Sequence, residues 1–307
     1  MRLAGRFALA LLFVAACKVA DDPPAGDDDP GDPDASSGSP DSGDDPADPD
    51  AAPEDDPAAG VEWFTWPEQQ PQLGEAGWGD ALTDVARHIP AKYGDTYWFD
   101  EPMTAAHETS HGIHAHLRNY ESPPGPRVNA FYVLDDRVAF VVEPDIRKSD
   151  VNPHVPQVLR GPRYDLYLDG QDAWDDTPLY LFDEWNAYCN GSQVGVEQVQ
   201  EGLYQGEWTD GVMGSLEFTA YAIATAKAIA EGDPDYFASN LQFRRFTAWE
   251  IARCMALFEA GRVMDEFAWD VQEDYAAALR THASAESLRQ FARDTWGAAW
   301  TEEHLGF

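Results

Sequence analysis

The sequence is poor in basic residues, cysteine and long apolar runs. Lys and Arg number 20 against 56 Asp and Glu among 307 residues, so the formal net charge is −36. Binding to nucleic-acid phosphates needs clustered Lys and Arg, so the composition argues against a nucleic-acid partner. Three cysteines are too few for a disulfide scaffold and show no CxxC spacing. No run reaches the roughly 18 apolar residues of a membrane-spanning helix.

The first residues instead have the pattern of an export signal. Arg2 and Arg6 precede a short apolar stretch at residues 7–16, an order typical of a secretory signal peptide. The letters VAAC at residues 14–17 resemble the lipobox of bacterial lipoproteins. That resemblance implies a signal peptide of residues 1–16, lipid on Cys17, and a location in the bacterial cell envelope, at the outer membrane or cell surface. An ordinary signal peptide with an incidental cysteine is the alternative.

An acidic, proline-rich segment follows, at residues 17–60. Residues 21–60 hold 15 Asp and Glu and nine Pro but no Lys or Arg, so this stretch repels itself and cannot bury apolar surface. We expect a disordered tether that leads to one folded domain at residues 61–307. Because residues 1–20 carry three positive charges and residues 21–60 fifteen negative ones, the domain keeps a net charge of −24. This charge favours cationic or neutral substrates.

Apolar periodicity and turn residues predict an α+β domain with a small sheet and a mostly helical C-terminal part. A β-hairpin is expected at residues 129–144 with Asp135 and Asp136 at its turn, and irregular chain at residues 145–176. Gly191 is expected to end one of the helices. The helices are predicted at residues 80–89, 102–120, 178–190, 214–231, 240–262, 265–281 and 284–297.

The strongest chemical signal is the HExxH pattern at residues 107–111. His107 and His111 are four residues apart on a predicted helix, so both imidazoles lie on one face and can reach a single ion. Glu108 lies beside them, where it can take a proton from a water that zinc has acidified. Two surface histidines on a solvated helix are the plainer interpretation. His114 is expected to be only a polar neighbour.

A catalytic zinc site needs a third protein ligand. The metzincin arrangement is excluded, because Leu117 stands where that family has its third histidine. Glu184 is the first candidate, since its helix face also carries apolar residues. The neighbouring Asp183 points about 100° away and is expected to be more solvated. Glu217, in an apolar helix, is the runner-up.

The residues that follow Glu184 resemble the second motif of the gluzincin metallopeptidases. That motif runs Glu-x-x-Ala/Ser and, in thermolysin-like members, continues with Asp and then Gly. Here Ala187 and Gly191 stand three and seven residues after Glu184, and Tyr188 replaces the Asp. The shorter Glu-x-x-Ala form also resembles the anthrax-lethal-factor-like peptidases. Because that Asp orients a ligand histidine in the thermolysin-like family, Tyr188 leaves the orienting residue unassigned.

The resemblance implies a zincin-like fold in which His107, His111 and Glu184 bind Zn²⁺ and Glu108 is the general base. The sequence thus predicts an exported zinc metalloendopeptidase that acts on a peptide or protein substrate. A tethered surface-binding lipoprotein on the same fold, without catalysis, is the alternative, and a metal-dependent hydrolase of a non-peptide bond is a third. An intact Glu108 favours an enzyme, because metal binding alone needs no base there.

Three tyrosines on the predicted helices are candidates to donate a hydrogen bond to the oxyanion of the reaction. They are Tyr180, Tyr188 and Tyr221. A core tyrosine whose hydroxyl is bonded locally is the plainer interpretation of each.

If Cys17 carries lipid, Cys189 and Cys254 are the two cysteines that remain, and they lie in an oxidising compartment. A disulfide between them would stabilise the fold by about 4 kcal/mol in the chain-entropy model. Two buried free thiols are the alternative.

Overall fold

The computed structural model describes residues 56–206 and 209–307. The expectations for the signal peptide at residues 1–16, for lipid on Cys17 and for most of the acidic tether lie outside the described residues. Within the described part of the chain, no helix is both long enough and apolar enough to cross a membrane.

The end of the predicted tether, residues 56–60, forms turns. Arg245 donates a hydrogen bond to the Gly60 carbonyl oxygen at 3.2 Å, which fixes this segment to a later helix. Residues just before the predicted domain boundary at residue 61 therefore already pack against the domain.

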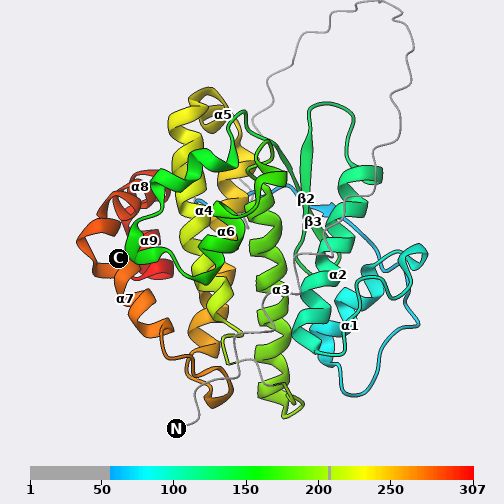
Figure 1. Cartoon of the computed structure of the whole chain (residues 1–307). Coiled ribbons are helices and arrows are strands. Elements are labelled where there is room, and N and C mark those ends of the chain that lie inside the picture. The colour runs from blue at the N-terminus through cyan, green and yellow to red at the C-terminus, as the bar shows by residue number, and fades with distance from the viewer. Residues whose placement is uncertain (1–55, 207–208) are drawn as a thin grey trace, which may run out of the picture. The chain divides into compact units, whose positions relative to one another are not determined.

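The described residues form α-helices around a small antiparallel sheet, which confirms the α+β class (Figure 1). In the sheet, β3 lies between β1 and β2. The strands are β1 Phe64–Thr65, β2 Val128–Tyr132 and β3 Arg137–Val142. The helices are α1 Gly79–His88, α2 Pro102–His116, α3 Tyr180–Glu201, α4 Met213–Gly232, α5 Pro234–Ser239, α6 Leu241–Gly261, α7 Gln272–Thr281, α8 Glu286–Trp296 and α9 Ala298–Leu305.

The central helix is α3, which packs against α2 on one side and against α4 and α6 on the other (Figure 1). The core accordingly has two apolar clusters. In the larger one, Phe131 stacks on Phe246 with ring centroids 5.0 Å apart. The smaller one joins α1, α2 and the sheet through Leu82, Ile113 and Val138. Burial on both sides leaves α3 almost without a solvent-facing surface.

The predicted hairpin is confirmed, with Val128 paired to Val142 in the β2–β3 register. Leu134, Asp135 and Asp136 have left-handed φ angles of 69°, 54° and 60° at its turn, a conformation that costs free energy for a residue with a Cβ atom.

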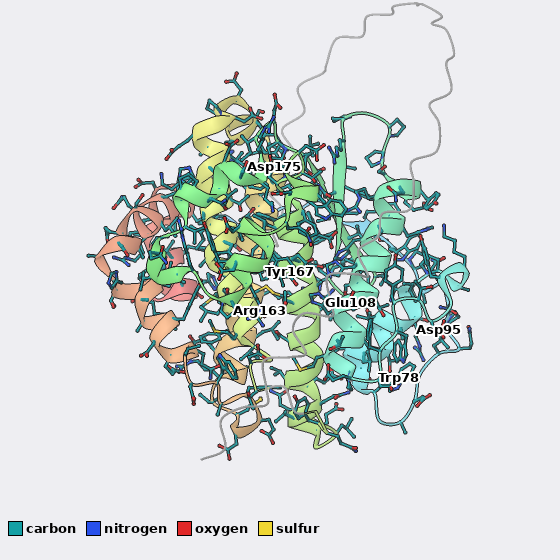
Figure 2. All side chains as sticks on the ribbon, viewed as in Figure 1. Trp78, Asp95, Glu108, Arg163, Tyr167 and Asp175 are labelled. Atoms are coloured by element: carbon teal, nitrogen blue, oxygen red, sulfur yellow. A yellow bond between two sulfur atoms is a disulfide. The ribbon has the colours of Figure 1, made fainter. Side chains whose placement is uncertain are left out.

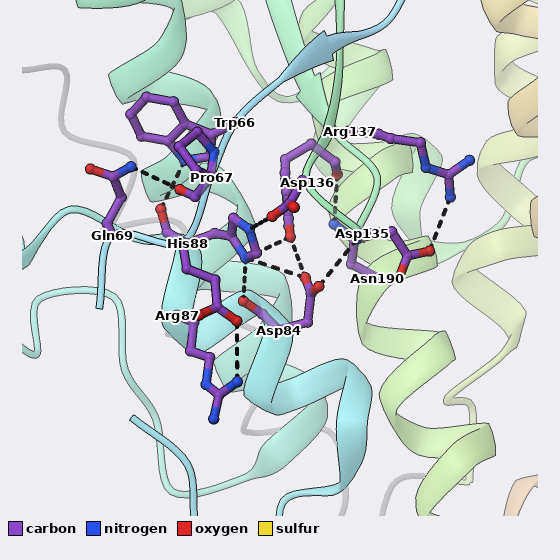
Figure 3. A network of polar contacts seen from close by, with 12 residues as sticks. Trp66, Pro67, Gln69, Asp84, Arg87, His88, Asp135, Asp136, Arg137 and Asn190 are labelled. Atoms are coloured by element: carbon purple, nitrogen blue, oxygen red, sulfur yellow. Dashed lines mark hydrogen bonds and ion pairs between the residues drawn. The ribbon is translucent and has the colours of Figure 1, made fainter. Parts of the chain in front are cut away.

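Contacts with α1 hold this turn in place (Figure 3). The Asp135 amide donates to Asp84 Oδ2 at 3.1 Å. His88 Nε2 lies 2.6 Å from Asp136 Oδ1, and Nδ1 of the same ring lies 2.6 Å from the Asp84 carbonyl oxygen. The polar groups of α1 therefore help to stabilise the left-handed backbone of this turn.

Several helical segments differ from the sequence prediction. The helix expected at 265–281 begins only at residue 272, after a separate 3₁₀ turn at Asp265–Phe267. A π-helical turn at Leu117–Glu121 forms the end of the helix predicted at 102–120. The segment at 145–176, expected to be irregular, holds short 3₁₀ and π-helical turns, and the final helix α9 was not expected.

The largest error concerns α3, which does not end at Gly191. The helix continues to Glu201 and ends where Gly202 takes a left-handed φ of 71°. A Cβ atom at residue 191 would lie 2.9 Å from the carbonyl oxygen of Met103 on α2. Gly191 therefore allows α2 and α3 to approach closely instead of ending the helix.

Replacing Gly191 with Ala should separate α2 from α3, because the methyl group meets backbone that cannot rotate away. We expect a loss of about 1–3 kcal/mol in the free energy of unfolding and weaker zinc binding, both measured on the same preparation. Gly77→Ala is the control, since a Cβ at residue 77 meets no atom within 4 Å. Equal stability and zinc affinity in the two variants would contradict this role of Gly191.

Glu143 ties the end of β3 to the start of α3. Its Oε1 accepts a hydrogen bond from the Leu179 amide at 2.9 Å, and its Oε2 accepts one from the Asn129 side chain. Burial raises the pKa of the Glu143 carboxyl to about 7. The folded protein therefore binds this proton more tightly than the unfolded chain does, which favours folding at acidic pH.

This stabilisation should be present below about pH 4.5 and be lost as the pH rises through 7. Between pH 5 and pH 8, the free energy of unfolding should decline in the wild type by about 2 kcal/mol more than it does in Glu143→Gln. Urea titrations at the two pH values measure this difference. Parallel pH profiles for the two proteins would rule out a raised pKa at Glu143.

Candidate metal centre

Helices α2 and α3 bring the three predicted ligands together. The Nε2 atoms of His107 and His111 are 3.1 Å apart, and they lie 3.6 and 3.5 Å from Glu184 Oε2. Ligands about 2.0–2.2 Å from a tetrahedral zinc ion are about 3.3 Å from one another. The triangle of these three atoms, which we call the ligand triangle, therefore has the size that one zinc ion requires.

The two oxygens of Glu184 have different surroundings. Oε1 accepts a hydrogen bond from the Tyr180 hydroxyl at 2.7 Å. Oε2, which faces the two histidines, is buried and has no hydrogen-bond partner among the described residues. A buried carboxylate oxygen without a donor is costly. A positive charge in the ligand triangle offsets that cost, whether it comes from a protonated His111 or from a bound metal ion, so the donor set is compatible with a metal ion.

Asp183 orients the second histidine. Its Oδ1 accepts from His111 Nδ1 at 2.7 Å and from His114 Nδ1 at 2.6 Å, while Arg118 lies 3.4 Å from Oδ2. A hydrogen on Nδ1 leaves His111 Nε2 free to bind metal. The orienting carboxylate that the sequence left unassigned is thus adjacent to Glu184, and His114 is a buried part of the arrangement.

The prediction that Asp183 is more solvated is wrong. Its side chain is buried, and so are Asn186 and Asn190 on the same face of α3. The Asn186 side chain donates to Glu250 on α6 at 2.8 Å, and Arg253 donates to Asn190 Oδ1 at 2.6 Å. This polar face is therefore occupied by hydrogen bonds between helices.

Burial and neighbouring charges set the protonation of these groups. Burial lowers the pKa of His107 well below its ordinary value, and His111 lowers it further. Burial also lowers the pKa of His111, but Glu184 and Asp183 outweigh it and hold that pKa well above its usual range. Burial raises the pKa of Asp183, yet His114 and His111 hold it well below normal. Metal binding must therefore displace a proton from His111.

Glu108 lies in the middle of α2 (Figure 2), within reach of the charges of His111 and Glu184. Only 4% of its surface is exposed. Burial raises the pKa of its carboxyl, and the charge of Glu184 raises it further against the opposing effect of His111. A raised pKa makes this carboxylate a stronger base than an ordinary glutamate, as a general base requires.

The three predicted tyrosine donors have different positions. The Tyr180 hydroxyl is bonded to Glu184, as described above. The Tyr188 ring meets the edge of His107 with centroids 4.5 Å apart. Tyr221 instead donates to Glu217 at 2.6 Å, away from the triangle, so the structure leaves it without a role there.

Tyr167, which was not predicted from the sequence, belongs to the π-helical turn Tyr164–Asp169. Its hydroxyl lies 3.3 Å from that of Tyr188. Burial and the charge of Glu184 raise the pKa of Tyr167 well above its ordinary value, so the hydroxyl keeps its proton as a donor. No sequence motif or periodicity points to Tyr167, because the segment at residues 145–176 was predicted to be irregular.

Glu217, the runner-up ligand, is engaged elsewhere. Its Oε2 accepts from Arg163 at 3.1 Å, and Arg163 also bonds Asp210 at 3.1 Å. A carboxylate paired with a buried guanidinium needs no metal. The structure therefore places Glu217 in a separate ion pair and favours Glu184 as the third ligand.

Cys189 and Cys254 form a disulfide that links α3 to α6, with Cα atoms 5.6 Å apart. The pairing agrees with the expectation from the sequence. Glu250 lies close enough to these sulfurs to complete a metal-binding group, but two sulfurs joined in a disulfide are not thiolate ligands. The bond instead fixes the helix that carries Glu184.

Replacing Asp183 with Asn should weaken zinc binding about 10- to 100-fold, because His111 loses the charged acceptor that fixes its ring. Competition with a chromophoric chelator measures this change. Asp176→Asn, at an exposed position, controls for the loss of one negative charge. Equal zinc affinity in the two variants would show that Asp183 does not orient the ligand.

No family model matches the chain, and no curated protein and no solved structure is significantly similar to it.

Proposed function

We propose that this protein is a zinc-dependent metallopeptidase of the gluzincin type with a zincin-like fold. The observation that carries the proposal is the ligand triangle of His107, His111 and Glu184. Three features support it further: the unpaired Glu184 Oε2, the orienting carboxylate of Asp183, and the buried Glu108. We propose in addition that lipid on Cys17 attaches the domain to the bacterial cell envelope.

Each protein group has a distinct task in this proposal. Zinc, when bound, would lower the pKa of water towards 7 and polarise the scissile carbonyl group. Glu108 takes the proton from the attacking water and passes it to the leaving amine, which its raised pKa allows. Tyr167 and Tyr188 keep their hydroxyl protons and are the candidate donors to the developing oxyanion. Asp183 holds His111 in the tautomer that binds metal.

The acidic domain supports a preference for neutral or cationic peptides. With a net charge of −24 outside the first sixty residues, it attracts basic segments and repels acidic ones at low ionic strength.

A non-catalytic binding protein is the second candidate, and the burial of the site favours it. The side chains of His107, His111 and Glu184 are 14%, 9% and 2% exposed. Structural zinc sites are closed, whereas catalytic sites keep one position open to water and substrate. The presence of Glu108 argues for the enzyme, since a structural site does not need a base.

A single experiment separates these two functions. Protein is stripped with a chelator, reloaded with one equivalent of zinc, and incubated with a mixed peptide library that is read by mass spectrometry. We expect new peptide termini only in the zinc-loaded sample. Stoichiometric zinc without any cleavage, at several pH values, would favour the binding protein.

A further inference from the structure

A second candidate site lies at the start of α2, where the chain forms a pocket of about 610 Å³. The pocket is lined from three parts of the chain: α1 and the segment before it, the segment that leads into α2, and the end of α3 with the residues that follow it. Trp78, at the start of α1, lies apart from Tyr167 and Arg163 at the centre of the molecule (Figure 2). None of the zinc ligands lines this pocket.

One wall of the pocket is aromatic. The rings of Trp78 and Trp98 lie with centroids 4.7 Å apart and planes tilted by 39°, and both side chains are only partly buried. Indole has the most electron-rich face of the common aromatic side chains, so it attracts a cation placed over the ring.

The charged groups of the pocket all have the same sign. Glu75, Asp100 and Glu101 line it, and no lining residue among those described is Lys, Arg or His. The carboxylates of Glu75 and Asp100 are exposed at its rim. Three carboxylates without a counter-charge favour a cationic occupant.

Two buried oxygens in the lining residues lack donors. Gln198 is 1% exposed, and its Nε2 donates to the Trp78 carbonyl oxygen at 3.0 Å. Its Oε1 has no partner among the described residues, and neither does Glu101 Oε1. The other Glu101 oxygen caps α2 by accepting from the Thr104 amide at 2.7 Å. Both unpaired atoms are acceptors, so the polar groups of this wall add no hydrogen-bond donor that would disfavour a cationic occupant.

We propose that this pocket binds the guanidinium group of an arginine side chain presented by a protein or peptide. A guanidinium carries a positive charge, stacks on indole faces and offers five N–H donors. It therefore matches both the aromatic wall and the carboxylates of the pocket. A quaternary ammonium group has the charge but no donor, and a neutral urea has donors but no charge.

Ligand-observed NMR titration of the zinc-free protein tests the proposal without reference to catalysis. The probes are N-acetyl-arginine amide, its neutral citrulline analogue and N-acetyl-trimethyllysine amide. We expect the arginine probe to bind at least tenfold more tightly than citrulline and several-fold more tightly than trimethyllysine. Citrulline binding as tight as arginine would overturn the proposal, as would the absence of arginine binding.

Two variants locate the binding. Trp98→Leu removes a ring face, and the double variant Glu75→Gln/Asp100→Asn removes two exposed charges that the fold does not need. Each should weaken arginine binding at least fivefold, whereas the exposed control Glu302→Gln on α9 should leave it unchanged. If Trp98→Leu does not fold, the double variant decides alone. Unchanged affinity in the double variant would place any arginine binding elsewhere, while the zinc proposal would stand.

Discussion

Replacing Glu108 with Gln should abolish peptide hydrolysis while zinc stays bound. Gln has nearly the same shape as Glu but cannot accept a proton near neutral pH, so the general base is lost and the ligand triangle is kept. General-base catalysis contributes about 100- to 10,000-fold to rate. We therefore expect kcat to fall by about that factor, measured on a peptide chosen from the library, with KM little changed.

Zinc content in the same samples is the necessary companion measurement. Glu108 is not in the ligand triangle, so Glu108→Gln should hold one zinc ion with wild-type affinity. Wild-type turnover in Glu108→Gln would remove this residue from the mechanism. Loss of zinc together with activity would mean that Glu108 has a structural role at the site.

Replacing Glu184 with Ala should weaken zinc binding at least tenfold and remove activity. Two imidazoles alone leave zinc under-coordinated, since catalytic sites usually have three protein ligands and a water. The change also removes the buried oxygen that faces His107 and His111. Chelator competition gives the affinity, and circular dichroism with mapping of the Cys189–Cys254 disulfide checks that the fold is retained.

Glu217→Gln is the matched control for this prediction. Glu217 is also a buried helical glutamate, but it pairs with Arg163 and not with the histidines. We expect Glu217→Gln to lose some stability and to keep its zinc. Full zinc occupancy in Glu184→Ala, with loss of zinc in Glu217→Gln, would reverse the ligand assignment and leave the HExxH assignment intact.

The HExxH helix and the β2–β3 hairpin could be predicted from the sequence, because local patterns determine both. Four-residue spacing places His107 and His111 on one helix face whatever surrounds them, and alternating apolar runs around Asp135 and Asp136 favour a hairpin. Glu184 could be proposed from a short motif and from the apolar residues on its face.

The role of Gly191 could not be predicted, because it depends on a neighbouring helix. In the sequence, a glycine that follows a helical stretch predicts the C-terminal end of the helix. In the folded chain it is the point where α3 meets the backbone of α2 at Met103. Only the position of α2 tells these two cases apart.

The role of Asp183 also could not be predicted, because it too depends on neighbouring helices. A helix face with Asp and two Asn residues is typical of a solvated surface. Here that face is covered by α2 and α6, and its side chains form hydrogen bonds with neighbouring helices, as Asp183 does with His111 and His114. Tyr167 depends even more on long-range packing, because it comes from a short π-helical turn without periodicity.

X-ray absorption at the zinc K-edge, on protein loaded with one equivalent of zinc, tests the central claim most directly. The ligand triangle predicts two imidazole nitrogens and carboxylate or water oxygens at about 2.0–2.2 Å, with no sulfur. The imidazole scattering should disappear in the double variant His107→Ala/His111→Ala. A sulfur shell at about 2.3 Å would assign the metal to Cys189 and Cys254, and zinc without imidazole ligands would contradict the proposed metal centre.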